Sequence, residues 1–335
     1  MPHRSHILLS GIAALALAAG VACWVWLQPS QGPISSHPHS AIPNLKSLPL
    51  LPVVEKIVRE GPQIPYLKFN FLIKELPLDL TPQDIDALIA FISGPKPPAF
   101  QDGEWGSLVN DIEECLTVQT VPSEKVAHAL IAIYRDESKI QMQRDYALQH
   151  IGGFLIYLIH TSPQNSEIQN HQSSIGNPSP SSSSQAPSSE LQALLLTELK
   201  SAASNTTKPW AGTALNLLDG SLRAADYRTM DVPGLDPEIL SSLAIPAARD
   251  TSAPLNARIP GLQVAARLNS SEALDLARSI VADPASPILL VQAAAATISQ
   301  LGSSEDLALL TNRLSANEKH ARSALNQAIQ KLSSH

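Results

Sequence analysis

The chain repeats itself at an offset of 33 residues near its C-terminal end, where Leu268–Leu274 (LNSSEAL) aligns with Leu301–Leu307 (LGSSEDL). The same offset pairs Asp250 with Asp283. A repeat of this length, carrying apolar residues at helical spacing, predicts stacked pairs of helices that bury their apolar faces against one another. The repeat constrains the architecture but identifies no substrate.

The composition suits close-packed helices and argues against one class of partner. Hydrophobic residues make up 44% of the chain but aromatic residues only 4%, so small and aliphatic side chains must fill the core. The formal net charge is −7, and no segment has a strong basic excess. Because the cationic surface that holds phosphates is missing, we do not expect nucleic acid as a partner.

Residues 7–27 form an uncharged apolar segment after Arg4, and Trp24 and Trp26 lie near its end. At about 1.5 Å rise per residue, a helix of this length spans a hydrocarbon core of roughly 30 Å. The pattern predicts a signal anchor over residues 1–27, with the bulk of the chain exported to the extracytoplasmic, periplasmic or cell-envelope side.

Two other interpretations of the N-terminal segment stay open. Gly20-Val21-Ala22 offers a small-residue cleavage site, so the segment could be a removed signal peptide. Gly-Val-Ala before Cys23 is similar to a lipoprotein acylation site, although it lacks the usual first Leu. All three interpretations place the remainder of the chain outside the cytoplasm.

Composition divides the rest of the chain into four regions. Residues 28–52 are rich in Pro and Ser and are predicted to be an extended tether, and residues 161–190 include a Ser/Pro run predicted to be a disordered insertion. Residues 53–160 are expected to form an N-terminal helical region with a cap and the first helix pairs. Residues 191–335 are expected to form C-terminal helical repeats.

Helix signals are clear from Leu80 onward and less clear before it. Val53–Glu60 could form a short helix, whereas Tyr66–Ile73 alternates partly, as a strand does. Further helices are predicted from N-cap residues and apolar spacing, and they begin near Pro82, Trp105, Pro122, Lys139, Leu191, Trp210 and Pro237. The helix that begins at Trp210 is predicted to end at Leu218.

Three segments resemble the second helix of a HEAT-type repeat. In that helix a basic residue, a small residue and a Leu/Ile-Gly ending recur. The segments that resemble it are Arg144–Gly152 (RDYALQHIG), Val291–Gly302 (VQAAAATISQLG) and Arg322–Leu332 (RSALNQAIQKL). The resemblance implies an all-α fold, a right-handed α-α superhelix of the HEAT-like (armadillo-type) solenoid class, preceded here by the anchor helix.

The residues that could carry chemistry do not form a recognisable catalytic or metal motif. Asp111, Glu113 and Glu114 follow one another on a helix and are expected on a solvated face. The helical histidines His128, His150 and His160 are too far apart for one metal, since His150 and His160 lie about 15 Å apart at 1.5 Å per residue. Cys115 is expected to be a small apolar residue on a helix face. We predict no catalytic residue, no cofactor and no metal.

Four residues are predicted to contact a partner. Arg144, Asp145 and His150 would lie on an inner helix, where solenoids expose a binding surface. Trp210 could be a core residue or an exposed anchor, because interface hot spots favour Trp. The alternative for Arg144 and Asp145 is a salt bridge and packing within the repeat.

These features together predict a non-enzymatic, membrane-tethered, extracytoplasmic scaffold that binds a protein or peptide. Two alternatives remain. The first is an enzyme or enzyme subunit whose site is dispersed over helices, since fold does not exclude catalysis. The second is an architectural spacer of the envelope.

Overall fold

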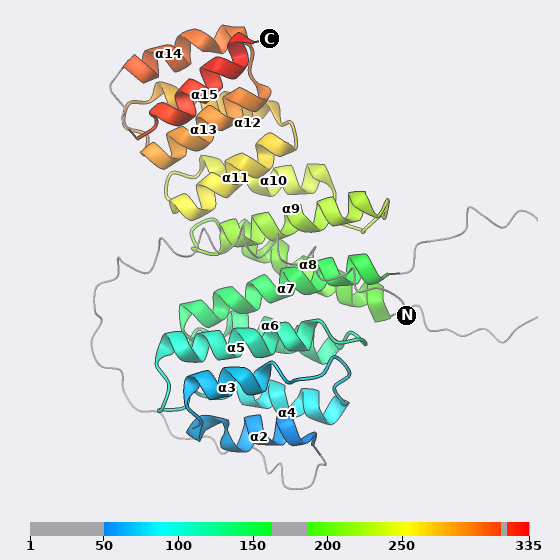
Figure 1. Cartoon of the computed structure of the whole chain (residues 1–335). Helices are drawn as coiled ribbons and strands as arrows, with labels where there is room; N and C mark the ends of the chain where they lie inside the picture. The colour runs from blue at the N-terminus through cyan, green and yellow to red at the C-terminus, as the bar shows by residue number, and fades with distance from the viewer. Residues whose placement is uncertain (1–49, 163–186, 316–319, 335) are drawn as a thin grey trace, which may run out of the picture. The chain divides into compact units, whose positions relative to one another are not determined.

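The computed structural model of the chain describes residues 50–162, 187–315 and 320–334, and these residues form helices with no strand among them (Figure 1). The first half contains α2 (Pro52–Glu60), α3 (Tyr66–Ile73), α4 (Pro82–Ser93), α5 (Asp102–Thr117), α6 (Glu124–Arg135), α7 (Gln141–Thr161) and α8 (Pro187–Ser204). The second half contains α9 (Ala211–Tyr227), α10 (Pro237–Arg249), α11 (Leu255–Arg267), α12 (Ser271–Ala282), α13 (Ile288–Leu301), α14 (Leu307–Ser315) and α15 (Arg322–Ser333). Short 3₁₀ turns lie at Gly61–Gln63 and Ser304–Asp306.

The described helices pack in two layers. Each even-numbered helix contacts the odd-numbered helix that follows it, which gives seven pairs from α2–α3 to α14–α15. Within the odd layer, every helix from α3 to α15 contacts the next odd-numbered helix, and the even layer repeats this order from α2 to α14 (Figure 1). The all-α, solenoid-like packing predicted from the repeat is therefore present.

The same turn joins the two helices of a pair at three places. Asp136, Asp250 and Asp283 follow α6, α10 and α12, and each next odd-numbered helix begins five residues later. Each carboxylate accepts a hydrogen bond of 2.9 Å from the backbone N–H two residues on. This Asx-turn fixes the exit of the chain from the even-numbered helix. The offset that pairs Asp250 with Asp283 thus marks a real structural repeat.

A capping box starts α4 and also ties it to the start of α2, its neighbour in the even layer. The Thr81 hydroxyl accepts from the Asp84 N–H at 3.2 Å, and the Asp84 carboxylate accepts from the Thr81 N–H at 3.2 Å. Asp84 also accepts from the Leu51 N–H at 2.8 Å. Its burial is tolerated because these bonds satisfy the carboxylate.

The strand-like interpretation of Tyr66–Ile73 was wrong, because this segment is the helix α3. Phe69 and Ile73 are buried four residues apart, which is the period of a helix face. Phe69 then packs in an aromatic cluster with Phe91 and Phe100, whose ring centroids lie 6.0 and 5.9 Å from its own. The buried residues of this segment, Phe69 and Ile73, are therefore spaced as on a helix and do not alternate as on a strand. The helix predicted at Val53–Glu60 is present as α2.

Small residues allow α9 and α11 to approach closely at their N-terminal ends. Ala211, Ala253 and Ala257 are buried together there. Gly212 follows Ala211, and a Cβ atom at this position would overlap the carbonyl oxygen of Asn256. The contact between these two odd-layer helices therefore depends on the missing side chain of Gly212.

The predicted anchor over residues 1–27 lies outside the described residues, as do most of the tether and residues 163–186 of the predicted insertion. Among the helices of the described ranges, none has the length and apolar character needed to cross a membrane.

We expect Gly212→Ala to destabilise the protein by about 1–3 kcal/mol, because the added methyl group forces α9 away from α11. Chemical denaturation followed by circular dichroism measures the change in the unfolding midpoint.

Gly153→Ala is the matched control. Gly153 is exposed within α7, and a Cβ atom there meets nothing within 4 Å. Since Gly weakens a helix interior relative to Ala, this change should stabilise the protein by roughly 0.5–1 kcal/mol. Equal midpoints for the two variants would contradict the close contact at Gly212.

Candidate functional site

Arg144 and Trp210 meet at a joint between α6, α7 and the start of α9. The Arg144 guanidinium lies 4.5 Å from the centre of the Trp210 ring. Its Nε donates to the Tyr134 carbonyl oxygen at 2.8 Å, and the Tyr134 ring packs edge-on against Trp210 with centroids 5.7 Å apart. Trp210 is buried. Both predicted partner-binding residues are therefore engaged inside the array.

Asp145 lies one residue further along α7 and joins the same pair of helices. Its carboxylate accepts from the Thr213 hydroxyl of α9 at 3.4 Å and from the Gln149 amide at 2.9 Å. Burial raises the pKa of Asp145, and these two hydrogen bonds act in the opposite direction. The structure thus brings Arg144, Asp145 and Trp210 together between α7 and α9.

His150 lies apart from these residues and faces α5. Its Nε2 is 3.1 Å from Asn110 Oδ1 and 3.8 Å from Glu113 Oε2. Burial lowers the pKa of His150 to about 4, so the imidazole is neutral at neutral pH. The neutral ring donates from Nε2 to Asn110 Oδ1, and it provides no positive charge to stabilise the Glu113 carboxyl group in its ionised form.

Glu113 was expected on a solvated face, and this expectation was wrong. The side chain is fully buried, and neither carboxyl oxygen has a hydrogen-bond partner. Burial raises the pKa of Glu113 well above its usual value. The reason is the layered packing, since α5 contacts α3, α4, α6 and α7 and has little surface left for water. Of its acidic neighbours, Glu114 is exposed and Asp111 accepts from the Asn70 amide at 2.7 Å.

The described residues do not bring together the ligands of a metal ion. The thiol of Cys115, which follows Glu114 on α5, is protonated and therefore a poor nucleophile at neutral pH. No group of three or more His, Cys, Asp or Glu in the described ranges could hold a metal ion. Burial and the nearby Glu114 charge raise the pKa of Cys115 to about 11, so it stays a thiol at neutral pH.

Sequence reasoning missed a surface cluster on α9 and α11. Asp219 is buried at this surface, with Arg267 Nη2 2.6 Å and Arg223 Nε 3.0 Å from its Oδ2. Arg267 Nε also donates to Asp219 Oδ1 at 3.1 Å. The Arg223 side chain is 67% exposed, and Tyr227, one turn further along α9, is 84% exposed.

This Arg/Tyr surface, defined as Arg223, Tyr227 and Arg267, was missed because the predicted helix stopped at Leu218. The continuing helical spacing of Leu218, Leu222 and the Asp219–Arg223 pair was the available signal. One buried carboxylate holds two guanidinium groups, so the cluster keeps a net positive charge at an exposed face.

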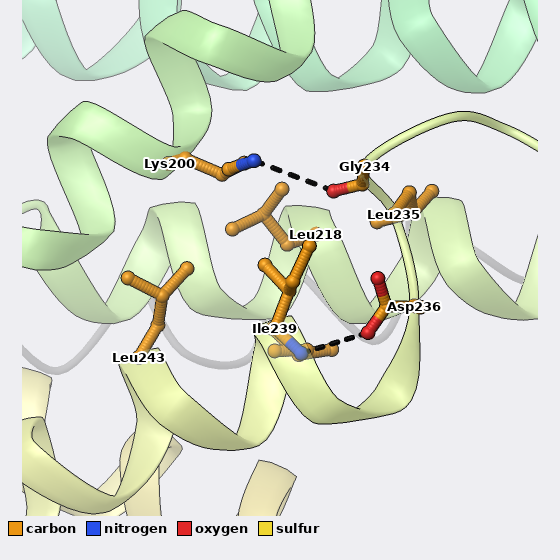
Figure 2. Close-up of a pocket in the computed structure, with 8 residues that line it drawn as sticks. Lys200, Leu218, Gly234, Leu235, Asp236, Ile239 and Leu243 are labelled. Carbon is orange, nitrogen blue, oxygen red and sulfur yellow. Dashed lines mark hydrogen bonds between the residues drawn. The ribbon is translucent and has the colours of Figure 1, made fainter.

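A shallow depression lies between α8, α9 and α10 (Figure 2). Its empty volume is about 160 Å³ with open solvent included, below the roughly 300–1,000 Å³ of small-molecule pockets. The Lys200 ammonium donates to the Gly234 carbonyl at 3.4 Å, and the Asp236 carboxylate accepts from the Ile239 N–H at 2.8 Å. Because these polar groups are used internally, the depression does not resemble a substrate site.

Comparison with known proteins does not assign the chain to a family. No family model and no curated protein matches the sequence. Among solved structures, human deoxyhypusine hydroxylase in complex with glycerol is 13% identical and similar over 84% of this chain and 95% of that one, with a TM-score of 0.31. A likeness this loose carries no argument about fold or activity.

We expect Glu113→Gln to stabilise the protein above pH 4.5, where the unfolded chain has lost this proton and the folded chain still holds it. In that window the wild-type protein loses stability as pH rises, because its unfolded state binds fewer protons. The gain should reach roughly 1–3 kcal/mol at neutral pH and disappear below pH 4.5. Denaturation midpoints across pH measure it.

Glu114→Gln is the control, because Glu114 is exposed beside Glu113. A pH-dependent gain of equal size in both variants would mean that Glu113 is not the buried titrating group.

Arg144 and Trp210 should be energetically coupled. A double-mutant cycle with Arg144→Gln and Trp210→Leu should give a coupling of about 0.5–2 kcal/mol in unfolding free energy, as expected for a guanidinium over an indole ring. Lys208 provides the comparison, since its Nζ lies 5.7 Å from the same ring centre. A Lys208→Gln cycle that gives the larger coupling would contradict the stacking of Arg144.

Proposed function

We propose that this chain is a membrane-tethered, extracytoplasmic scaffold that binds a protein or peptide partner, built as a HEAT-like solenoid with a right-handed α-α superhelix. The repeated Asx-turn and the two helix layers support the repeat class. In such arrays each repeat contacts only its neighbours, so a layer of helices presents a long continuous surface.

The observation that carries the proposal is the Arg/Tyr surface on α9 and α11. Tyr and Arg are enriched at interface hot spots. Tyr227 is exposed one turn along α9 from Arg223, and Arg223 shares the Asp219 carboxylate with Arg267. Asp219 fixes Arg267 through two contacts, so its side chain is already ordered before a partner arrives. We infer that the partner presents an acidic segment there.

The predicted partner contacts of Arg144, Asp145, His150 and Trp210 are revised within this proposal. Arg144, Asp145 and Trp210 hold α7 against α9, and the half-buried His150 bonds to Asn110 of α5. We therefore propose that they support the array indirectly, and that the partner contacts Arg223, Tyr227 and Arg267.

The tether and location rest on the sequence of residues 7–27, which has the length and apolar character of a signal anchor. Removal as a signal peptide or acylation at Cys23 would keep the helical array on the same side of the membrane.

The enzyme alternative is favoured by one observation, the buried Glu113 carboxyl group without a hydrogen-bond partner near His150. Buried acids with raised pKa values cluster at functional sites. The other candidate acids do not converge on this pair, since Asp145 bonds to Thr213 of α9 and Asp111 to Asn70 of α3. The envelope-spacer alternative requires no partner at the Arg/Tyr surface.

In-cell crosslinking of the membrane-bound full chain, followed by purification, tests the proposal. Arg223→Gln combined with Tyr227→Ala should weaken capture of the partner about tenfold or more, which corresponds to roughly 1.4 kcal/mol. Arg267 remains in this variant to pair with Asp219, so folding is preserved. Capture that is unchanged would remove the Arg/Tyr surface from the binding role.

Arg249→Gln is the matched control, an exposed arginine paired with Glu272 across α10 and α12 of the even layer. A third variant replaces residues 164–185 with a Gly/Ser sequence of equal length. It spares Ser162, whose carbonyl accepts from Arg228 at 3.0 Å, and Pro187, where α8 begins. Loss of capture in this variant alone would make the segment between α7 and α8 the recognition element.

A further inference from the structure

The first helices of the array expose large apolar side chains. Leu67 and Phe71, one turn apart on α3, are 70% and 66% exposed. Three more exposed apolar residues, Leu78, Val118 and Val121, lie at the ends of α3 and α5. The Thr120 N–H donates to the Leu78 carbonyl at 2.9 Å, which holds these two chain segments together.

The opposite end of the array follows the rule that terminal repeats of a solenoid carry a polar outer face. On α15 the apolar residues Leu325, Ala328 and Leu332 are buried. Its exposed residues are polar or charged, namely Arg322, Ser323, Asn326, Gln327, Gln330, Lys331 and Ser333. Tyr227 of α9 and Ile288 and Leu289 of α13 are also exposed, but five of the eight large exposed apolar residues in the described ranges lie near the N-terminal end. At that end α3 has a single described neighbour, α5, in its layer.

Chain connectivity indicates what covers α3. The apolar segment of residues 7–27 and the 22 residues of 28–49 precede α2, and α2 packs directly on α3. A Pro-rich tether of this length reaches at most roughly 70 Å, at about 3.1 Å per residue. A membrane that holds the anchor is therefore present at high effective concentration beside α3.

The charges around α3 suit a lipid surface of modest charge. Lys68 and Lys74 are exposed next to Leu67 and Phe71, and long ammonium side chains reach lipid phosphates while their stems cover apolar surface. Glu75 is exposed after Lys74, so the helix end is not strongly basic. Attachment therefore depends on apolar insertion, with Lys68 and Lys74 at the headgroup level.

We propose that α3 is a second membrane contact, in which Leu67 and Phe71 insert into the interfacial region of the bilayer that carries the N-terminal anchor. This inference rests on the anchor of the proposed function. It adds an orientation, because a lipid-bound α3 fixes the N-terminal end of the array against the membrane and leaves α9 and α11 to a partner.

The test is collisional relaxation of a nitroxide label on the full chain, reconstituted in vesicles of phosphatidylcholine with a minor share of phosphatidylglycerol. Cys23→Ser and Cys115→Ser form the background, and Phe71→Cys or Leu67→Cys carries the label. Both sites are exposed, so labelling should not disturb the fold. We expect oxygen, which concentrates in lipid, to relax these labels, and a water-soluble nickel chelate to be several-fold less effective than at a control site.

Tyr227→Cys is the control, an exposed apolar site outside α3. Equal nickel access at positions 71 and 227 would overturn the proposal. A label at position 71 shielded from both oxygen and nickel would also overturn it, because a second copy or residues 7–27 would then cover α3.

Flotation of the chain with vesicles is scored first, so that a missing anchor is recognised separately. A chain that does not float overturns both the anchor and the α3 contact. A floating chain with nickel-accessible α3 overturns only the contact, and loss of partner capture through Arg223 bears only on the scaffold role.

Discussion

Lateral packing within the odd layer is the constraint on which the rest of the structure depends. Each odd-numbered helix from α5 to α13 contacts an odd-numbered helix on both sides as well as its partner in the even layer. Such crowding requires small residues at particular points, as at Gly152, where a Cβ atom would come within 2.5 Å of Leu217 Cδ2, and at Gly212 beside Asn256. The same crowding removes Glu113 and Asp219 from water. The apolar core and the burial of these two carboxyl groups therefore have the same cause, which is the close lateral packing of the odd-numbered helices.

The sequence predicts those parts of the fold that are local. Helix starts carry their own signals, such as the Thr81–Asp84 capping box, and the offset between Asp250 and Asp283 marks a turn that the structure repeats. The third example, Asp136, lies outside that regular spacing, so self-comparison of the sequence does not find it. Tyr66–Ile73 was misjudged because this short segment, largely apolar but with Lys68 and Asn70 inside it, is compatible with both periods, and packing of Phe69 decides between them.

The candidate site is harder to predict because its contacts join separate repeats. Arg144 and Trp210 are 66 positions apart and Asp219 and Arg267 are 48 apart, so the register between neighbouring helix pairs decides whether they meet. The burial of Glu113 is hard to predict for the same reason, because it depends on helices that are distant in the sequence. Neighbouring acidic residues on a helix ordinarily face solvent, but α5 contacts four other helices and buries Glu113 in spite of its carboxyl group. Sequence periodicity reports which face of a helix is apolar and not how many neighbours surround it.

The arginines of α7, α9 and α11 have two different roles. One is used in packing between helices, and the others lie at the surface. Arg144 lies over Trp210 and bonds to a backbone carbonyl, so its charge is directed inward. Arg223 and Arg267 share one buried carboxylate, which needs both hydrogen bonding and charge to offset its desolvation. Two guanidiniums on one carboxylate leave an excess positive charge, and the exposed Arg223 retains N–H groups free to face a partner. In the proposed function, an acidic ligand would bind at this surface without removing the Arg267 ion pair that Asp219 needs to remain buried.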